Sequence, residues 1–152
     1  MADGVPADTE MAPEDVPDIS PDESLYRRCV PGWRAPGVKR PSVRDFRPRR
    51  WESNEQPGDV DGLSVTRPRL ANLEKVKTCP KTGKKFHVAE ITVELVTSLD
   101  LTVEKRPLVR NHGHALIPEL NSLDQRDPAR EVWMEERAKR LMNNALMVFL
   151  AS

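Results

Sequence analysis

Apolar and polar residues alternate over several short stretches of the chain. The clearest is residues 62–67, where Leu63 and Val65 alternate with Ser64 and Thr66. Successive side chains of a strand point to opposite faces, so this pattern is typical of a strand with one buried face. Similar short runs occupy residues 23–30, 85–91, 101–105 and 115–117. We therefore expect a small, mostly antiparallel sheet of four or five short strands.

Two segments between these runs suit short helices. Residues 70–76 have room for one or two helical turns before the turn-forming sequence of residues 79–83. Thr92 is a typical N-cap residue in front of Glu94 and Leu95, which predicts a short helix to about Ser98.

A longer helical pattern follows Asp127 and Pro128, which suit the N-cap and the first position of a helix. From there apolar residues recur on one face, with charged residues mostly on the other. The apolar residues are Ala129, Val132, Trp133, Ala138, Leu141, Met142, Ala145, Val148 and Phe149. We expect this helix to run to about Leu150 and to cover one face of the sheet. The predicted fold class is therefore α+β.

The first residues of the chain differ from the rest in composition. Residues 1–23 contain eight acidic residues and several prolines, and no aromatic residue, lysine or arginine. Such a segment buries too little apolar surface to offset the entropy lost on ordering. We expect a disordered acidic head over residues 1–23 and a single α+β domain over residues 24–152.

Basic residues are concentrated directly after this head. The formal net charge is zero, yet nine of the residues between Arg27 and Arg50 are basic and only Asp45 is acidic. The acidic head could screen this block, the block could meet a polyanion or an acidic protein face, or its charges could simply be solvated.

The same region is rich in proline and contains three aromatic residues. Cationic side chains can follow phosphates while aromatic rings stack on bases, so binding of single-stranded nucleic acid is one interpretation. The other is that Trp33, Phe46 and Trp51 anchor the loop of residues 31–61 to the core. The candidate basic and aromatic surface consists of Arg34, Lys39, Arg40, Arg44, Arg47, Arg49, Arg50, Trp33 and Trp51.

The sequence shows neither the pattern of a secretory signal nor that of a membrane span. The N-terminus is acidic where a secretory signal has a basic and then an apolar region, and no apolar run approaches the roughly 18 residues of a membrane span. Cys29 and Cys79 belong to no CxxC pair. We therefore expect a cytoplasmic protein with reduced thiols and no membrane partner.

The sequence contains no complete motif for phosphate binding, nucleophilic hydrolysis or zinc binding. Residues 81–85 lack the first glycine and the Ser or Thr of a phosphate-binding loop. No G-x-S-x-G elbow accompanies the pairing of Ser64 or Cys79 with His114. Zinc sites usually draw on two ligand pairs, and only one pair occurs among the candidate ligands Cys29, Cys79, His87, His112 and His114. We assign no catalytic residue, metal or cofactor.

Arg27, followed by Ser64 and Thr66 on a later strand, loosely resembles the pattern of ADP-ribosyltransferase-type enzymes. That resemblance implies an arginine that grips the dinucleotide phosphates and a late glutamate that orients the ribose. This chain has no Glu-x-Glu turn on a late strand, so the transferase step lacks its glutamate. The corresponding candidate cleft, for a nucleotide-containing substrate, consists of Tyr26, Arg27, Ser64, Thr66 and His114.

A second resemblance rests on short motifs between residues 23 and 118. The order LYRR, RPS, FRP and GLSV is similar to a group of small bacterial proteins without an established activity. It implies a bacterial origin and a compact α+β fold.

These observations favour a small, non-enzymatic accessory module that binds another protein in a bacterial system. The alternatives are an enzyme or binder for a nucleotide-containing substrate and a single-stranded nucleic-acid binder. The sequence leaves open the partner, the oligomeric state, and whether the apolar run 146–150 belongs to the core or to an interface.

Overall fold

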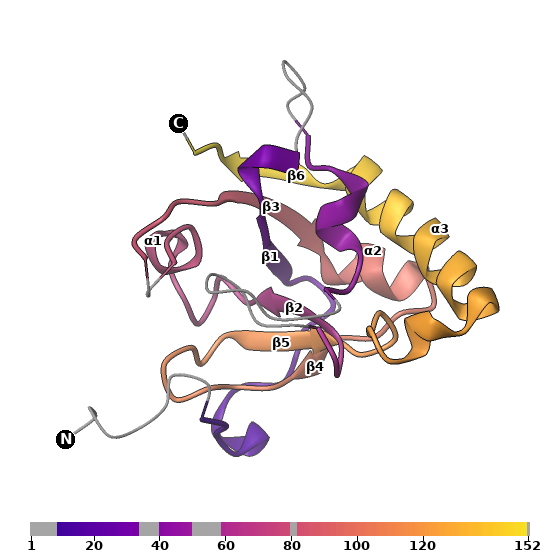
Figure 1. The fold of residues 1–152 in the computed structure, drawn as a ribbon. Coiled ribbons are helices and arrows are strands. Elements are labelled where there is room, and N and C mark those ends of the chain that lie inside the picture. Colours follow the sequence, from indigo (N-terminus) through magenta and orange to yellow (C-terminus); the bar gives the residue numbers. More distant parts are fainter. Residues whose placement is uncertain (1–8, 34–39, 50–58, 80–81, 152) are drawn as a thin grey trace.

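The computed structural model of the protein describes residues 9–33, 40–49, 59–79 and 82–151. Within them, six strands form one sheet in the order β4-β5-β2-β1-β3-β6, with every neighbouring pair antiparallel (Figure 1). The strands are β1 (Ser24–Cys29), β2 (Leu63–Thr66), β3 (His87–Thr92), β4 (Glu104–Lys105), β5 (His114–Ile117) and β6 (Leu146–Phe149). The sheet and its helices confirm the predicted α+β class, with six strands where four or five were expected.

The central strand β1 defines the two faces of the sheet. Leu25 and Arg27 are buried on one face, which we call the core face. Tyr26 and Arg28 alternate with them and point to the opposite face, which we call the outer face.

The main hydrophobic core lies between the core face and α3 (Pro128–Asn144), which runs along one side of the sheet in Figure 1. Met134, Ala138 and Leu141 are the buried residues of this helix. A 3-10 turn, Val43–Phe46, adds the fully buried Phe46 to the same core. Of the three aromatic residues expected to anchor the basic loop, Phe46 does so; Trp33 is partly exposed, and Trp51 lies outside the described residues.

Two short helices complete the fold. In α2 (Val93–Ser98), the Thr92 hydroxyl accepts a hydrogen bond from the Leu95 amide at 3.1 Å, as the predicted N-cap requires. The other helix, α1 (Leu73–Val76), lies on the outer face, where the Arg28 guanidinium donates to the Val76 carbonyl at 2.5 Å. Phe86 is buried in the same region, beneath the Arg28 guanidinium.

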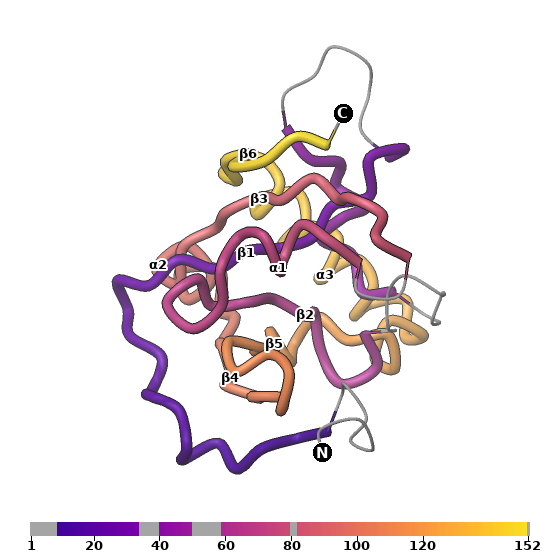
Figure 2. Tube along the Cα trace, turned by 90° about the vertical axis from the view of Figure 1, so that its left-hand side faces the viewer, coloured from indigo at the N-terminus to yellow at the C-terminus, as the bar shows by residue number. Residues whose placement is uncertain are grey.

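The acidic N-terminal segment passes around the β4 edge before the chain enters β1 (Figure 2). The Met11 amide donates to the Pro107 carbonyl at 2.9 Å, and Lys105 pairs with Asp18 at 2.6 Å. Glu23 is buried against Arg67 at 2.9 Å. The sequence predicted disorder over residues 1–23. Within this range, residues 9–23 contact the rest of the fold through Met11, Asp18 and Glu23. Residues 1–8 lie outside the described residues.

The C-terminal helix ends earlier than predicted. Instead of continuing to Leu150, α3 ends at Asn144, and Ala145 is already extended, with φ −82° and ψ 145°. The following residues form β6 and pair with the free side of β3. The run Leu146–Phe149 is apolar and suits either a helix face or a strand. The strand is favoured because the backbone amides and carbonyls along the free edge of β3 need hydrogen-bond partners.

Two details of α3 also correct the sequence-based prediction. The Asp127 carboxylate makes no capping hydrogen bond. The apolar pattern predicts a buried Val132, but Val132 is 67% exposed, whereas Met134, which lies outside that pattern, is 2% exposed. The buried face of α3 is thus set by Met134, Ala138 and Leu141.

Replacement of Leu141 by alanine tests this orientation of α3. Leu141→Ala should lower the free energy of unfolding by about 2–5 kcal/mol, because it leaves a cavity in the core. Val132→Ala should change it by less than about 1 kcal/mol, because that side chain faces solvent. Urea denaturation of both variants measures the difference, and equal losses would contradict the helix orientation.

Candidate functional site

Three side chains form a row across the outer face of the sheet. Tyr26 of β1 is the register partner of Thr66 in β2, and Thr66 is the partner of His114 in β5. Ser64 lies two residues before Thr66 and therefore points to the same face. All four residues are partly exposed. The structure thus brings four of the five predicted cleft residues together.

Ser64 and His114 are joined directly by a hydrogen bond. Ser64 Oγ lies 2.8 Å from His114 Nε2, and His114 Nδ1 lies 2.9 Å from the carbonyl oxygen of Arg106. A carbonyl oxygen only accepts hydrogen bonds, so the imidazole proton resides on Nδ1. His114 Nε2 is then the acceptor, and the Ser64 hydroxyl donates to it. The backbone of Arg106 therefore fixes both the tautomer and the orientation of the ring.

The surroundings of His114 favour the neutral ring. Burial lowers the pKa of His114 below its ordinary value, since an imidazolium loses solvation inside the fold. The hydrogen bond to the Arg106 carbonyl raises this pKa, the Arg106 guanidinium lowers it, and the carboxylates of Asp59 and Glu10 raise it. Because the lowering prevails, His114 is neutral at pH 7 and Nε2 retains its lone pair.

Arg27, the fifth residue of the predicted cleft, lies on the core face and is 1% exposed. Its Nε donates to the Asp45 carbonyl at 2.8 Å, and its Nη1 donates to the Ser64 carbonyl at 2.7 Å. Its Nη2 lies 3.4 Å from an oxygen of the buried Asp59 carboxylate. A guanidinium enclosed in this way is not available to grip a phosphate. The structure therefore separates Arg27 from the outer-face row, although Arg27 contacts the backbone of Ser64.

Asp59 connects this arginine to both neighbouring segments. Its carboxylate accepts from the Ser64 amide at 3.1 Å and from the Arg49 amide at 2.7 Å. The Arg49 guanidinium is 4.0 Å away, and burial, followed by the nearby charge of Arg27, lowers the pKa of Arg49 to about 9. Arg49 therefore stays charged at pH 7. No sequence pattern marks Asp59, which lies in a loop 32 residues after Arg27.

Asp45 closes the cluster on its other side. Its carboxylate accepts from the amides of Val30 at 2.9 Å and Ser42 at 3.0 Å. Burial raises the pKa of Asp45, while those two hydrogen bonds and the charges of Arg27 and Arg49 act against the increase. Two arginines and two aspartates thus meet inside the fold.

Several residues of the predicted basic surface are engaged in internal contacts. Arg47 donates two hydrogen bonds of 2.6 Å to the Glu135 carboxylate on α3, and Arg49 is directed toward Asp59. Arg44 lies over the Trp33 ring at 4.2 Å, and Arg40 is exposed. Arg34, Lys39, Arg50 and Trp51 lie outside the described residues.

The described part of the chain offers little support for a metal site or a reactive thiol. No group of three or more potential ligands is assembled there. Cys29 and Cys79 are both buried, and they are not joined in a disulfide. Burial raises the pKa of the Cys29 thiol, so the reactive thiolate is disfavoured at neutral pH. None of the described helices is both long and apolar enough to cross a bilayer.

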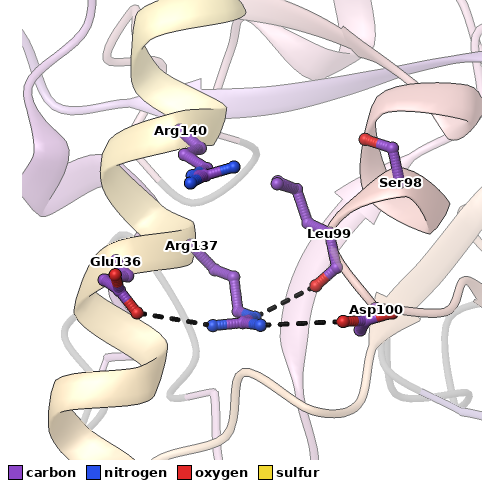
Figure 3. Close-up of a pocket in the computed structure, with 6 residues that line it drawn as sticks. All are labelled: Ser98, Leu99, Asp100, Glu136, Arg137 and Arg140. Atoms are coloured by element: carbon purple, nitrogen blue, oxygen red, sulfur yellow. Dashed lines mark hydrogen bonds and ion pairs between the residues drawn. The ribbon is translucent and has the colours of Figure 1, made fainter.

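A small hollow between α2 and α3 is lined by Ser98, Leu99, Asp100, Glu136, Arg137 and Arg140 (Figure 3). Arg137 points into it, donates to the Leu99 carbonyl at 3.0 Å and lies 3.8 Å from the Asp100 carboxylate (Figure 3). These contacts join the end of α2 to α3. No sequence pattern marks these residues, because charged residues on the polar side of a helix carry no distinctive signal. We attribute the hollow to helix packing.

No family model, no curated protein and no solved structure matches this chain. Its function is therefore argued from geometry alone.

The lowered pKa of His114 is directly measurable. Titration of its ring by nuclear magnetic resonance should give a midpoint below the ordinary value of about 6.5. The unfolded chain then binds more protons than the folded chain below that pH. His114 should accordingly contribute a loss of stability as the pH falls from about 6.5 through the folded pKa. A His114→Gln variant assigns the signal, and a midpoint at or above 6.5 would contradict the burial of this ring.

Proposed function

We propose that this protein is a protein-interaction module that binds an extended segment of another protein along β6. The observation that supports this most strongly is the character of that strand. β6 is the last strand in the sheet order and contains no charged residue. Leu146, Val148 and Leu150 are 65%, 37% and 42% exposed. Exposed apolar side chains beside an open sheet edge are typical of a surface that a partner covers.

The opposite edge of the sheet supports the same conclusion by contrast. There, β4 contains only Glu104 and Lys105, and the N-terminal segment lies beside it. Glu10 forms a bridge with Leu108 and lies 3.4 Å from the Arg106 guanidinium. Short length, charge and a covering segment are the usual ways in which proteins protect a sheet edge. Among the described residues, β4 is short, charged and covered by the N-terminal segment. By contrast, β6 contains no charged residue, and its apolar side chains are exposed.

The chemistry of an open edge indicates the kind of partner. Unpaired backbone amides and carbonyls match those of another extended chain, so a peptide can extend the sheet by one strand. The apolar side chains of β6 would then favour a segment with apolar residues at alternate positions. We therefore propose an extended, apolar protein segment as the ligand.

The alternatives from the sequence have less support. A nucleotide cleft would lack Arg27, which is enclosed on the core face. A nucleic-acid surface would lack Arg47 and Arg49, which face Glu135 and Asp59. We place the interaction in a bacterial cytoplasm, where cysteines such as Cys29 and Cys79, which are not joined in a disulfide, stay reduced.

Lysine substitutions on β6 test this proposal. The double variant Leu146→Lys/Val148→Lys should keep its fold, because both side chains are exposed, but should lose the partner that the wild-type protein captures from its host. With the purified partner, calorimetry should show affinity at least about tenfold weaker, which corresponds to about 1.4 kcal/mol.

Val132→Lys is the matched control, because Val132 is also apolar and exposed but lies on α3. This variant should bind like the wild type. The proposal fails if the β6 variant binds as tightly as the control, or if the wild-type protein captures no specific partner.

A further inference from the structure

Ser64 and His114 have a geometry that the interaction surface on β6 does not require. The Ser64 hydroxyl donates to His114 Nε2 over 2.8 Å, and the opposite ring nitrogen is held by the Arg106 carbonyl at 2.9 Å. A hydroxyl, a base and a group that orients the base are the three parts of an activated nucleophile. Here the orienting group is a backbone carbonyl.

The backbone of Ser64 is also held in place from the core face. Its amide donates to Asp59 at 3.1 Å, and its carbonyl accepts from Arg27 Nη1 at 2.7 Å. Arg27 and Asp59 are almost fully buried, so their positions are set by packing. Catalytic side chains need this kind of support from rigid elements, because small displacements cost reactivity. Arg27 and Asp59 would act as positioning residues for Ser64.

The pair also lies on the outer face of the sheet. Ser64 and His114 are each partly exposed on the outer face, away from α3 and the main core. The Ser98 hydroxyl offers a contrast: it donates to the Leu95 carbonyl at 2.6 Å within α2, and a carbonyl cannot act as a base. Ser64 is thus distinguished by a neutral imidazole that can take its proton.

We propose that Ser64 is a nucleophile that accepts an acyl group from a small ester or thioester, with His114 as general base. Ser64 Oγ would form a bond to the acyl carbon while its proton moves to His114 Nε2. The ester C–O or thioester C–S bond then breaks, and the leaving alcohol or thiol takes that proton. Water, deprotonated by His114, next attacks the acyl-serine. This releases the carboxylic acid and restores the Ser64 hydroxyl.

A fluorophosphonate probe and p-nitrophenyl acetate test this proposal on the full chain. Intact-mass and peptide mass spectrometry should show one phosphonyl adduct, located on Ser64, and the protein should release p-nitrophenol from the ester. Ser64→Ala should abolish both. His114→Gln should slow both by about 100-fold or more, which is the usual contribution of a general base.

Two controls separate this activity from general serine reactivity and from nonspecific effects of a surface substitution. Ser98→Ala and Val132→Lys should react like the wild type, because both residues lie away from Ser64 and from β6. A thermal melt should show that each variant is folded. If Ser64→Ala does not fold, Ser64→Cys replaces it, and its alkylation by iodoacetamide should then depend on His114.

The proposal is overturned if the wild-type protein gives no adduct on Ser64, if His114→Gln reacts at the wild-type rate, or if alkylation of Ser64→Cys is independent of His114. None of these results bears on the proposed binding along β6, which is measured separately.

Discussion

The fold depends on a charged pair inside it. Arg27 lies in the central strand, points toward the core and faces the carboxylate of Asp59. A buried arginine is tolerated only when its charge and donors are satisfied, since removal of one partner leaves an uncompensated charge. Arg27 meets this condition by contacting the 43–46 turn, β2 and the loop residue Asp59 at once. The pair therefore fixes how the irregular segments are placed on the sheet.

Arginine has the same role elsewhere in the chain. Arg67 is fully buried and contacts Glu23 together with the carbonyls of Pro17 and Asp18. Arg28 donates to the carbonyls of Lys75 and Val76 at the end of α1. In each case a planar group with five donors satisfies backbone carbonyls that no strand or helix pairs. Much of the basic character of the sequence thus serves to attach loops to the sheet.

The sequence predicted the parts of the fold that have a regular period. Strands β1, β2, β3 and β5 and the Thr92 cap follow from local alternation and local hydrogen bonding. The end of α3 could not be predicted in this way, because residues 146–149 are apolar under either structure and the free edge of β3 decides between them. The site was predicted in part. Ser64 and His114 meet as neighbours on one face. Strand alternation also places Arg27 on the face of Leu25, opposite Tyr26, so the predicted grouping of Tyr26 with Arg27 was wrong. The partner of Arg27, Asp59, could not be predicted, because it lies far away in the sequence and carries no pattern.

A double-mutant cycle on Arg27 and Asp59 tests the central claim most directly. Urea denaturation would give the free energies of unfolding of Arg27→Met, Asp59→Ala and the double variant. Each single change should cost about 3–5 kcal/mol, because it leaves one buried charge without its partner. The double change should cost clearly less than the sum of the two. Additive losses, or a loss for Asp59→Ala no larger than that for exposed Asp61→Ala, would contradict the account.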